Sequence, residues 1–250
     1  MDFKDHFSTQ AEGYAQFRPD YPAEWYRFLQ QKVKPSYRAW DVGTGNGQVA
    51  FQLADFFEEV WATDASAAQI ERARPHEKIR YGVSTAENSG LPDAYFDLIT
   101  VAQALHWFET ERFYDEVRRV AKPGAWVAIW GYNLARIHPE IDLISDYLYE
   151  DILGEAYWPP ERKILEAGYQ TLDFPFVEEA VPAFEMQKEW DLSHWYGYLE
   201  SWSSVQAYWR KNGQSPLGRI WPALKEAWGN EKAKKRISWP LHIRLGQVYA

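Results

Sequence analysis

The chain has 250 residues, of which 46% are hydrophobic and 25% charged, and a formal net charge of −9. This length suits one sizeable α/β domain with a modest insert, and the hydrophobic content excludes a disordered chain. The acidic balance argues against a general nucleic-acid binder, because neutralising phosphates requires a basic surface. Aromatic residues make up 17% of the chain, enough to fill a core and also to line a pocket.

Cysteine is absent, which excludes disulfides, thiolate catalysis and cysteine-bound zinc. The histidines show no metal-ligand spacing, so we expect no metal. The N-terminus lacks the layout of a signal peptide, and no apolar stretch is long enough to span a bilayer. The sequence therefore predicts a cytoplasmic protein without a membrane partner, and it says nothing of the oligomeric state.

The first elements of the chain predict a parallel α/β sheet. Arg18–Val33 predicts a proline-initiated helix ahead of the first strand. Beyond it, short apolar runs alternate with helix-like segments, as is typical of βαβ folds. The apolar runs are Ala39–Val42, Val60–Thr63, Ile79–Val83, Phe96–Ala102 and Ala125–Trp130.

Two of the intervening helices can be delimited from their ends. Ser66 followed by Gln69 predicts a capping box, with Pro75 ending that helix. The second helix is expected over Glu109–Ala121, before a Lys-Pro-Gly break. Its buried face would consist of Phe113, Val117 and Val120.

The second half of the chain is less regular. Ile141–Leu153 predicts a helix, and Phe174–Trp190 alternates enough to supply a strand. The last strand is expected within His242–Ala250. Between these strands, Leu192–Trp228 is helical in pattern and rich in aromatic residues.

A glycine-rich loop follows the first strand. Gly43, Gly45 and Gly47 stand directly after Asp41-Val42 and before a helical pattern. Glycine tolerates positive φ and lets a ligand approach the main chain, and the helix start offers free N–H groups. A tight strand-to-helix turn without a ligand is the alternative. The G-x-G-x-G spacing differs from the G-x-G-x-x-G of dinucleotide sites, so a nicotinamide cofactor fits less well.

Other polar positions follow the ends of the neighbouring strands. Asp64 comes at the end of the second run, where an acidic side chain can accept hydrogen bonds from both ribose hydroxyls. A turn or helix-capping role is the alternative. Thr85-Ala86-Glu87 follows the third run, and Gln103-Ala104-Leu105-His106 follows the fourth. In open parallel sheets, ligands bind at this carboxyl edge.

Taken together, these segments resemble the class I S-adenosylmethionine-dependent methyltransferases. Within that class the sequence is similar to the type 11 small-molecule group, which includes trans-aconitate methyltransferase-like proteins. The resemblance is carried by DVGTGNG (Asp41–Gly47), Asp64, TAEN (Thr85–Asn88) with LPDAYFDLIT, AQALHWF (Ala102–Phe108) and AKPGAWVAIW (Ala121–Trp130). Outside this region, YAQFRPDYP (Tyr14–Pro22) and YLESWSSVQAY (Tyr198–Tyr208) match the same group.

The resemblance implies an α/β fold with a Rossmann-like, seven-stranded, mainly parallel sheet. Its last strand is antiparallel, and helices flank the sheet and form a cap. The chain would be a single methyltransferase domain in three parts. Residues 1–36 would form N-terminal cap helices, 37–132 the cofactor-binding core, and 133–250 a C-terminal half with the cap insertion and last strands.

The resemblance also implies S-adenosyl-L-methionine as cofactor and S-adenosyl-L-homocysteine as product. The Gly43–Gly47 loop would face the methionine part, Asp64 the ribose, and Gln103 the sulfonium side. Arg18 is a candidate partner for the cofactor carboxylate. The full implied set is Tyr14, Arg18, Asp41, Gly43, Thr44, Gly45, Gly47, Asp64, Ala65, Ala86, Glu87, Gln103 and Ala104, with Ala86 and Glu87 at the adenine.

The partner implied by the resemblance is a small-molecule methyl acceptor, with carboxylic acids among the candidates. A carboxylate is a nucleophile at neutral pH and needs no base, whereas an amine or hydroxyl does. His106 is the only histidine at the expected catalytic edge, as a base or as pocket lining. The expected acceptor pocket consists of His106, Trp107, Tyr132 and Trp202.

Further side chains have two interpretations each. Arg136 and Arg244 could bind an acidic substrate, or lie on the surface as solvated arginines. Trp195, Tyr196, Tyr198, Trp202, Tyr208 and Trp209 could line the acceptor pocket or bury one face of a helix. Two other classes of function stay open at this point: a nicotinamide-dependent oxidoreductase, and a non-catalytic cofactor-binding protein.

Overall fold

The computed structural model of the chain describes residues 19–249. The strands are β1 (Arg38–Val42), β2 (Glu59–Asp64), β3 (Ile79–Val83), β4 (Phe96–Ala102), β5 (Ala121–Tyr132), β6 (Val177–Glu179), β7 (Glu185–Trp190) and β8 (Lys235–Gln247). The α-helices are α2 (Ala23–Lys32), α3 (Gln48–Leu53), α4 (Ala67–Ile70), α5 (Thr110–Val120), α6 (Pro139–Tyr147), α7 (Gly154–Tyr157), α8 (Arg162–Glu166), α9 (Leu192–Glu200), α10 (Ser203–Asn212) and α11 (Trp221–Trp228). Three short helical segments complete the list: η1 (Leu105–Trp107), η2 (Leu148–Leu153) and η3 (Pro216–Arg219).

The sheet has the mainly parallel topology that the sequence predicts. Its strands lie in the order β3-β2-β1-β4-β5-β8-β6, and β7 pairs with β8 off this path. The pairs from β3 to β5 are parallel, whereas β8 runs antiparallel to β5, β6 and β7. The expected seven strands therefore form the continuous path, and β7 is an addition along the far half of β8.

Strand order reverses between β1 and β4, because the chain first builds β2 and β3 on one side of β1 and then crosses to the other. Val42 at the end of β1 pairs with Thr63 of β2 and with Val101 of β4. The carboxyl ends of these three strands therefore meet at one edge of the sheet. Such a reversal is the usual ligand position in open α/β sheets.

The central strands are almost wholly apolar because helices cover both faces of the sheet. In β4, Ile99 and Val101 pack on the face covered by α5, while Leu98 packs on the face covered by α2 and α3. The α5 prediction is confirmed to within one residue at each end, with Phe113, Val117 and Val120 fully buried. The helix predicted before the first strand is α2, which begins after Pro22.

The capping-box prediction for Ser66 is wrong. Ser66 occupies the N-cap of α4, but its side chain makes no capping hydrogen bond, and the helix ends at Ile70 rather than near Pro75. The carboxylate of Asp64 accepts the Ser66 N–H at 2.8 Å. This is the N–H that the Gln69 side chain would bond in a capping box, so Asp64 takes that part of the motif.

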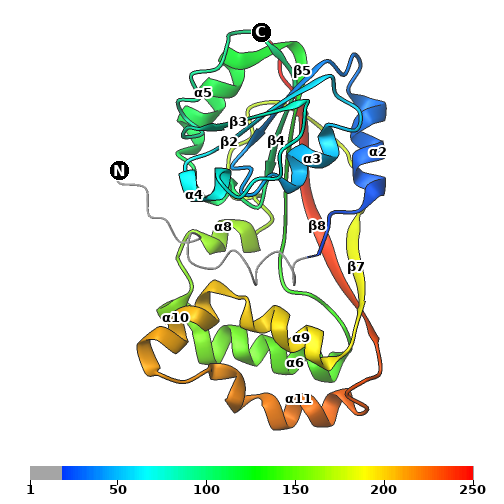
Figure 1. Cartoon of the computed structure of the whole chain (residues 1–250), viewed down its shortest axis with the longest axis vertical. Helices are drawn as coiled ribbons and strands as arrows, with labels where there is room; N and C mark the ends of the chain where they lie inside the picture. Colours follow the sequence, from blue (N-terminus) through cyan, green and yellow to red (C-terminus); the bar gives the residue numbers. More distant parts are fainter. Residues whose placement is uncertain (1–18, 250) are drawn as a thin grey trace.

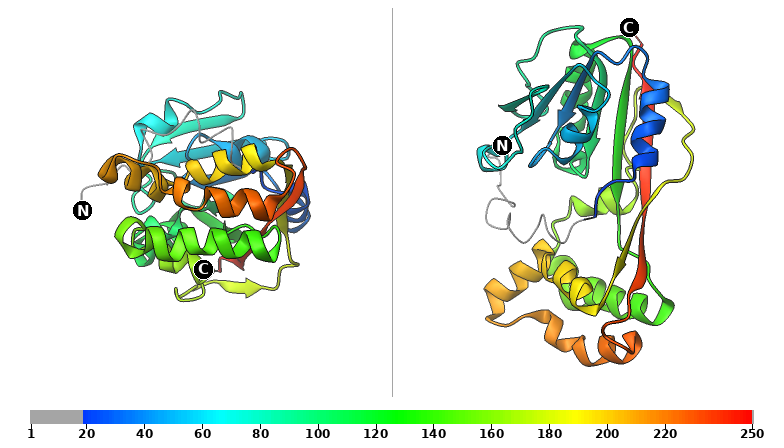
Figure 2. Two further views of the ribbon diagram at one scale, coloured as in Figure 1. Left: turned by 90° about the horizontal axis from the view of Figure 1, so that it is seen from below. Right: turned by 45° about the vertical axis from the view of Figure 1, so that its right-hand side comes forward.

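A second, helical layer lies away from the sheet and forms the cap (Figure 1). The Ile141–Leu153 helix is confirmed as α6 continued by the π-helical η2. The helices α6, α9 and α11 lie side by side in both orientations (Figures 1 and 2). They share a core of buried aromatic and aliphatic side chains that includes Trp195, Tyr198, Trp202 and Trp239.

Long connections join the cap to the sheet. The predicted strand in Phe174–Trp190 is two strands, β6 and β7, separated by a segment containing Pro182, which cannot donate to a β-ladder. β8 spans both layers, because Lys235–Pro240 pairs with β7 and Leu241–Gln247 with β5. The short α8 lies between the carboxyl edge of the sheet and the cap (Figure 1). Within residues 19–249, no helix is both long and apolar enough to cross a membrane.

Candidate functional site

The glycine loop turns sharply at the carboxyl end of β1. Gly43, Gly45 and Gly47 all adopt positive φ, at 64°, 58° and 86°, a region that disfavours residues with a Cβ atom. The Thr44 N–H donates to the Thr63 carbonyl at 3.0 Å, and the Gly47 N–H donates to the Thr44 carbonyl at 3.0 Å. The turn is therefore fixed by the backbone and tied to β2.

The three glycines differ in what surrounds them. A Cβ atom on Gly43 would lie 2.7 Å from the Cβ of Ala104, and one on Gly47 would lie 2.9 Å from a ring carbon of Tyr81. A Cβ on Gly45 would meet no atom of the described residues within 4 Å. A Cβ atom at Gly43 or Gly47 would thus collide with neighbouring side chains, whereas at Gly45 the described residues leave its position open.

Asp64 at the end of β2 is joined directly to this loop. One carboxylate oxygen accepts the Gly45 N–H at 2.9 Å, and the other accepts the Ser66 N–H at 2.8 Å. Asp64 therefore places a carboxylate beside the half-buried backbone of Gly45.

Asp41 lies beneath the loop rather than on its open side. It is 1% exposed, and its carboxylate accepts hydrogen bonds from the hydroxyls of Thr44 at 2.5 Å and Thr100 at 2.7 Å. Burial raises the pKa of Asp41 to about 6, against the opposing effect of these hydrogen bonds. Asp41 therefore stabilises the loop from its buried side, by its hydrogen bond with Thr44.

Gln103 continues the site from the end of β4 in an unusual conformation. Its φ of 56° is positive, and the nitrogen of its side-chain amide donates to the Tyr132 carbonyl at 3.1 Å. Its side-chain oxygen is buried and has no hydrogen-bond partner among the described residues. Strained backbone and unsatisfied buried polar atoms concentrate at functional sites. Gln103 is therefore the residue of this edge that most strongly indicates a ligand-binding position.

The remaining predicted cofactor residues lie close to this edge with varied exposure. Ala86 and Ala104 are buried, and Ala65 is half-buried. Glu87 is half-buried and accepts the Glu109 N–H at 2.8 Å. Tyr14 and Arg18 lie outside the described residues, so their predicted roles stay predictions.

His106 lies in η1, directly beyond the end of β4, and is 8% exposed. Its Nδ1 is 3.3 Å from the hydroxyl of Tyr169, and its ring is 4.7 Å from that of Trp107. Burial, and then the charge of Arg162, lower the pKa of His106 to about 3. The imidazole is therefore neutral at physiological pH.

The predicted pocket residues Tyr132 and Trp202 are both buried, one at the end of β5 and the other in the cap. The Trp202 ring lies 5.8 Å from that of Trp158 and 6.0 Å from that of Tyr149. Arg162, at the start of α8, contacts this aromatic group through the Trp158 ring. On the sheet side, α8 packs against η1, the segment that contains His106.

Sequence reasoning missed four residues of this group: Tyr149, Trp158, Arg162 and Tyr169. They come from η2, α8 and the segments around α8, and no spacing or motif joins them to the glycine loop. The WPPER segment from Trp158 to Arg162 offers a local signal, since its two prolines precede a short helix. That signal indicates a turn and no chemistry.

Known proteins share both this sequence and this architecture. Residues 40–129 match the family described as Methyltransferase domain. A Dictyostelium discoideum protein named as a methyltransferase is 30% identical over 98% of this chain and 95% of its own length. The solved structure of a methyltransferase from Anaeromyxobacter dehalogenans is 44% identical, with a TM-score of 0.86, covering 93% of this chain and 98% of that one. The chain belongs to the class I S-adenosylmethionine-dependent methyltransferases.

A methyltransferase of Aspergillus terreus is more distantly similar, at 23% identity over 94% of this chain and 92% of its own length. The cofactor of the present chain, as a member of this family, is S-adenosylmethionine. Family membership replaces the nicotinamide-dependent interpretation of the glycine loop. Among the described residues of the methyltransferase, no group of three or more histidine, aspartate or glutamate side chains is arranged to hold a metal ion.

The structure corrects the substrate-binding interpretation of Arg244. In the methyltransferase this side chain is 10% exposed and forms a two-fold ion pair with Glu178, with both nitrogen–oxygen distances at 2.9 Å. A third nitrogen donates to the carbonyls of Tyr169 and Leu172. Arg136 is exposed and pairs with Asp146, as expected for a surface arginine.

Replacing Arg244 with alanine should lower the free energy of unfolding by about 2 kcal/mol, because two buried carbonyls and Glu178 lose a charged donor. Chemical denaturation measures this loss. The matched control is Arg27→Ala, since Arg27 is exposed and its ion pair within the described part of the chain is with Glu24; its effect should stay within about 0.5 kcal/mol. Unchanged stability of the Arg244→Ala variant would contradict the structural role.

The aromatic residues of the cap divide by position. Trp195 and Tyr198 are buried in the cap core, confirming the helix-packing interpretation for these two. Tyr196 and Tyr208 are partly buried at its edge. Trp209 is 52% exposed, so it lines no enclosed pocket.

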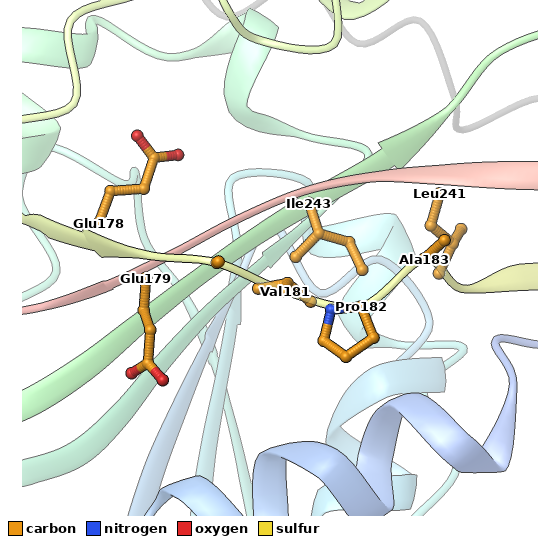
Figure 3. Close-up of a pocket in the computed structure, with 8 residues that line it drawn as sticks. Glu178, Glu179, Val181, Pro182, Ala183, Leu241 and Ile243 are labelled. Atoms are coloured by element: carbon orange, nitrogen blue, oxygen red, sulfur yellow. The ribbon is translucent and has the colours of Figure 1, made fainter.

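A surface hollow of about 380 Å³ lies where β6 leads into β7 (Figure 3). Glu178 and Glu179 point to opposite sides of the strand there (Figure 3). Both are paired, Glu178 with Arg244 and Glu179 with Lys32. None of the residues that line the hollow belongs to the glycine loop or to the ends of β2 and β4, so the hollow is separate from the methyltransferase site.

Proposed function

We propose that the chain transfers a methyl group to a small-molecule acceptor, a carboxylic acid, held between the carboxyl edge of the sheet and the helical cap. Within the family, the proposed subgroup is the type 11 small-molecule group with its trans-aconitate methyltransferase-like members. The proposal treats the chain as one methyltransferase domain. A cytoplasmic location and the absence of a nucleic-acid partner stay predictions of the sequence.

The residues at the carboxyl edge fit S-adenosylmethionine. The open side of Gly45 offers room for the methionine part, and the Asp64 carboxylate beside it suits the ribose hydroxyls. Ala86 and Glu87 would lie at the adenine. The buried side-chain oxygen of Gln103, which has no hydrogen-bond partner among residues 19–249, is assigned to the sulfonium side, where a polar atom facing a positive sulfur is favourable.

Alignment and exclusion of water are the main contributions of the chain. When bound, the cofactor supplies a methyl group on positively charged sulfur, and transfer is an in-line displacement. The rate of such a reaction depends largely on holding acceptor and methyl group in line. Trp107, Tyr132 and Trp202 are proposed to line the acceptor side, and His106 to border it.

The neutral state of His106 carries the assignment of the acceptor class. A group with a pKa of about 3 is a weak base, and efficient general bases have pKa values near the working pH. The Tyr169 hydroxyl, fully buried with its pKa raised by burial, is protonated and can donate to His106 Nδ1. His106 would then present its Nε2–H as a donor. A carboxylate acceptor requires no base and accepts such a hydrogen bond.

The test is a methyl-transfer screen combined with a pH profile. With radiolabelled cofactor, small carboxylic acids should yield base-labile methyl esters, and kcat should stay constant from pH 6 to pH 9 because the pKa of His106 lies near 3. The His106→Gln variant should show the same flat profile. Nuclear magnetic resonance should show no titration of the His106 ring between pH 5 and pH 8.

If kcat falls as the pH is lowered, with an apparent pKa near 7, and His106→Gln abolishes this pH dependence, the result would contradict the assignment and indicate a base. Methylation confined to amines or phenols would do so as well.

The stability of the protein gives an independent check. An unfolded histidine titrates near pH 6.5, so the unfolded state binds a proton that the folded state rejects. Stability should therefore fall as the pH drops below 6.5, less steeply in His106→Gln.

A further inference from the structure

Arg162 occupies a position between the two layers of the protein. It is the first residue of α8, which packs against η1 and β5 on the sheet side and lies beneath the sheet edge, facing the cap (Figures 1 and 2). Its side chain is 22% exposed. A partly buried guanidinium at the edge of a ligand site is uncommon without a role, because burying a charge requires compensation.

Aromatic side chains of the cap hold the guanidinium in place. Its central carbon lies 4.3 Å from the ring centre of Trp158 and 5.4 Å from that of Tyr149. Its Nε donates to the Tyr149 hydroxyl at 2.6 Å, which itself donates to Glu166. Arginine stacked on an aromatic ring keeps its planar fork of donors in a fixed direction.

Much of the hydrogen-bonding capacity of Arg162 is unused. Its nearest carboxylate, Glu166, is 3.9 Å from Nε, too far for a hydrogen bond. Neither terminal nitrogen has a hydrogen-bond partner within residues 19–249. These two nitrogens form the edge that binds a carboxylate through two parallel hydrogen bonds.

The positive charge also acts on the sheet side of the site. It lowers the pKa of His106, after burial, and it lowers that of Tyr169 against the larger raising effect of burial. On this side, α8 packs against η1, the segment that contains His106. Arg162, the first residue of α8, therefore lies between η1 and the aromatic group around Trp202.

We propose that the guanidinium of Arg162 binds a carboxylate of the methyl acceptor, with the Trp158 ring fixing its orientation. This inference rests on the proposed function and names the side chain that selects an anionic acceptor. In an acid with several carboxylates, Arg162 binds a carboxylate other than the one that is methylated. In a monoacid, it binds the carboxylate that is methylated. Arg136 and Arg244 do not compete for this role, because each is paired with a carboxylate of the protein.

The experiment uses the full chain and a defined panel of acids. Methyl transfer is measured to succinate, propane-1,2,3-tricarboxylate and 3-phenylpropanoate, each beside its carboxamide counterpart, with phenyl phosphate as a separate anion. Arg162→Gln removes the charge, Arg162→Lys keeps it without the planar fork, and Arg27→Gln is the matched exposed control. Titration with S-adenosylhomocysteine reports whether each variant folds and keeps the cofactor site.

At least one acid should be methylated, and its carboxamide should not. Arg162→Gln should raise the KM of that acid by about 30-fold or more, the loss expected for a charged two-fold hydrogen bond. The KM of S-adenosylmethionine should stay within about two-fold, since the hydrogen bond that is lost belongs to the acceptor. The KM of the acid for Arg162→Lys should lie between the values for the wild type and Arg162→Gln, and its value for Arg27→Gln should equal that of the wild type.

The inference is overturned by turnover of a carboxamide as fast as its acid, by an unchanged KM in Arg162→Gln, or by binding and methylation of none of the acids. Preference for phenyl phosphate over every acid would replace carboxylate with phosphate as the ligand and overturn it too. If the acids are methylated but Arg162→Gln leaves their KM unchanged, only this inference falls. If S-adenosylhomocysteine binds while none of the acids is methylated, the carboxylic-acid assignment of the acceptor falls with it. If the wild type binds no S-adenosylhomocysteine and methylates nothing, the proposed function itself falls.

Discussion

Replacing Gly45 with alanine is expected to weaken S-adenosylhomocysteine binding more than 100-fold, over about 2.7 kcal/mol, while the protein stays folded. The backbone cost is modest, about 1 kcal/mol for alanine at a φ of 58°. No described atom lies within 4 Å of the added Cβ, so packing is undisturbed. The methyl group would instead stand in the space assigned to the methionine part of the cofactor.

Gly43→Ala provides the contrasting variant. Its Cβ would lie 2.7 Å from the Cβ of Ala104 and 3.2 Å from the Phe108 ring, and neither the backbone nor a packed ring can yield cheaply. This variant should lose stability in denaturation, whereas Gly45→Ala should lose mainly affinity in calorimetry. Equal affinity of Gly45→Ala and wild type would contradict the placement of the cofactor over Gly45.

Replacing Asp64 with alanine is expected to have a comparable effect on the cofactor for a different reason. The carboxylate holds the N–H groups of Gly45 and Ser66 and is assigned to the ribose hydroxyls. Hydrogen bonds to a charged group contribute about 1.5–3 kcal/mol each, so the dissociation constant of S-adenosylhomocysteine should rise at least 100-fold. Calorimetric titration measures it directly.

The controls for Asp64 separate charge from shape and from general acidity. Asp64→Asn keeps the size of the side chain and one acceptor oxygen, and should fall between wild type and alanine. Asp115→Ala removes an exposed carboxylate of α5 that pairs with Arg118, and should leave the affinity unchanged. An Asp64→Ala variant that binds S-adenosylhomocysteine as tightly as Asp115→Ala would refute the ribose assignment.

The sheet was predictable because its central strands are largely buried and mainly apolar. Val60–Thr63 and Phe96–Ala102 are mainly apolar for that reason, and the structure places them in β2 and β4. The edge where β1, β2 and β4 end follows from parallel pairing alone. The proximity of the glycine loop to Asp64 could therefore be predicted from the sequence, and the Gly45–Asp64 hydrogen bond joins them in the structure.

Pairings over long sequence separations were not predictable. Arg244 pairs with Glu178, 66 residues earlier, and nothing in the local pattern of either segment indicates it. Arg162 reaches the site only because α8 is folded between η1 and the aromatic side chains of the cap. The error at Ser66 has a local cause instead, since Asp64 accepts the Ser66 N–H that the Gln69 side chain would bond in a capping box.

The central claim is that the carboxyl edge around Gly45, Asp64 and Gln103 binds the S-adenosylmethionine of this methyltransferase. Calorimetric titration of the full chain with S-adenosylhomocysteine, beside the same titration with reduced nicotinamide dinucleotide, tests it most directly. The account predicts micromolar-range binding of S-adenosylhomocysteine, roughly −8 kcal/mol, and no binding of the dinucleotide. Absence of S-adenosylhomocysteine binding by the folded wild type, or tighter binding of the dinucleotide, would contradict it.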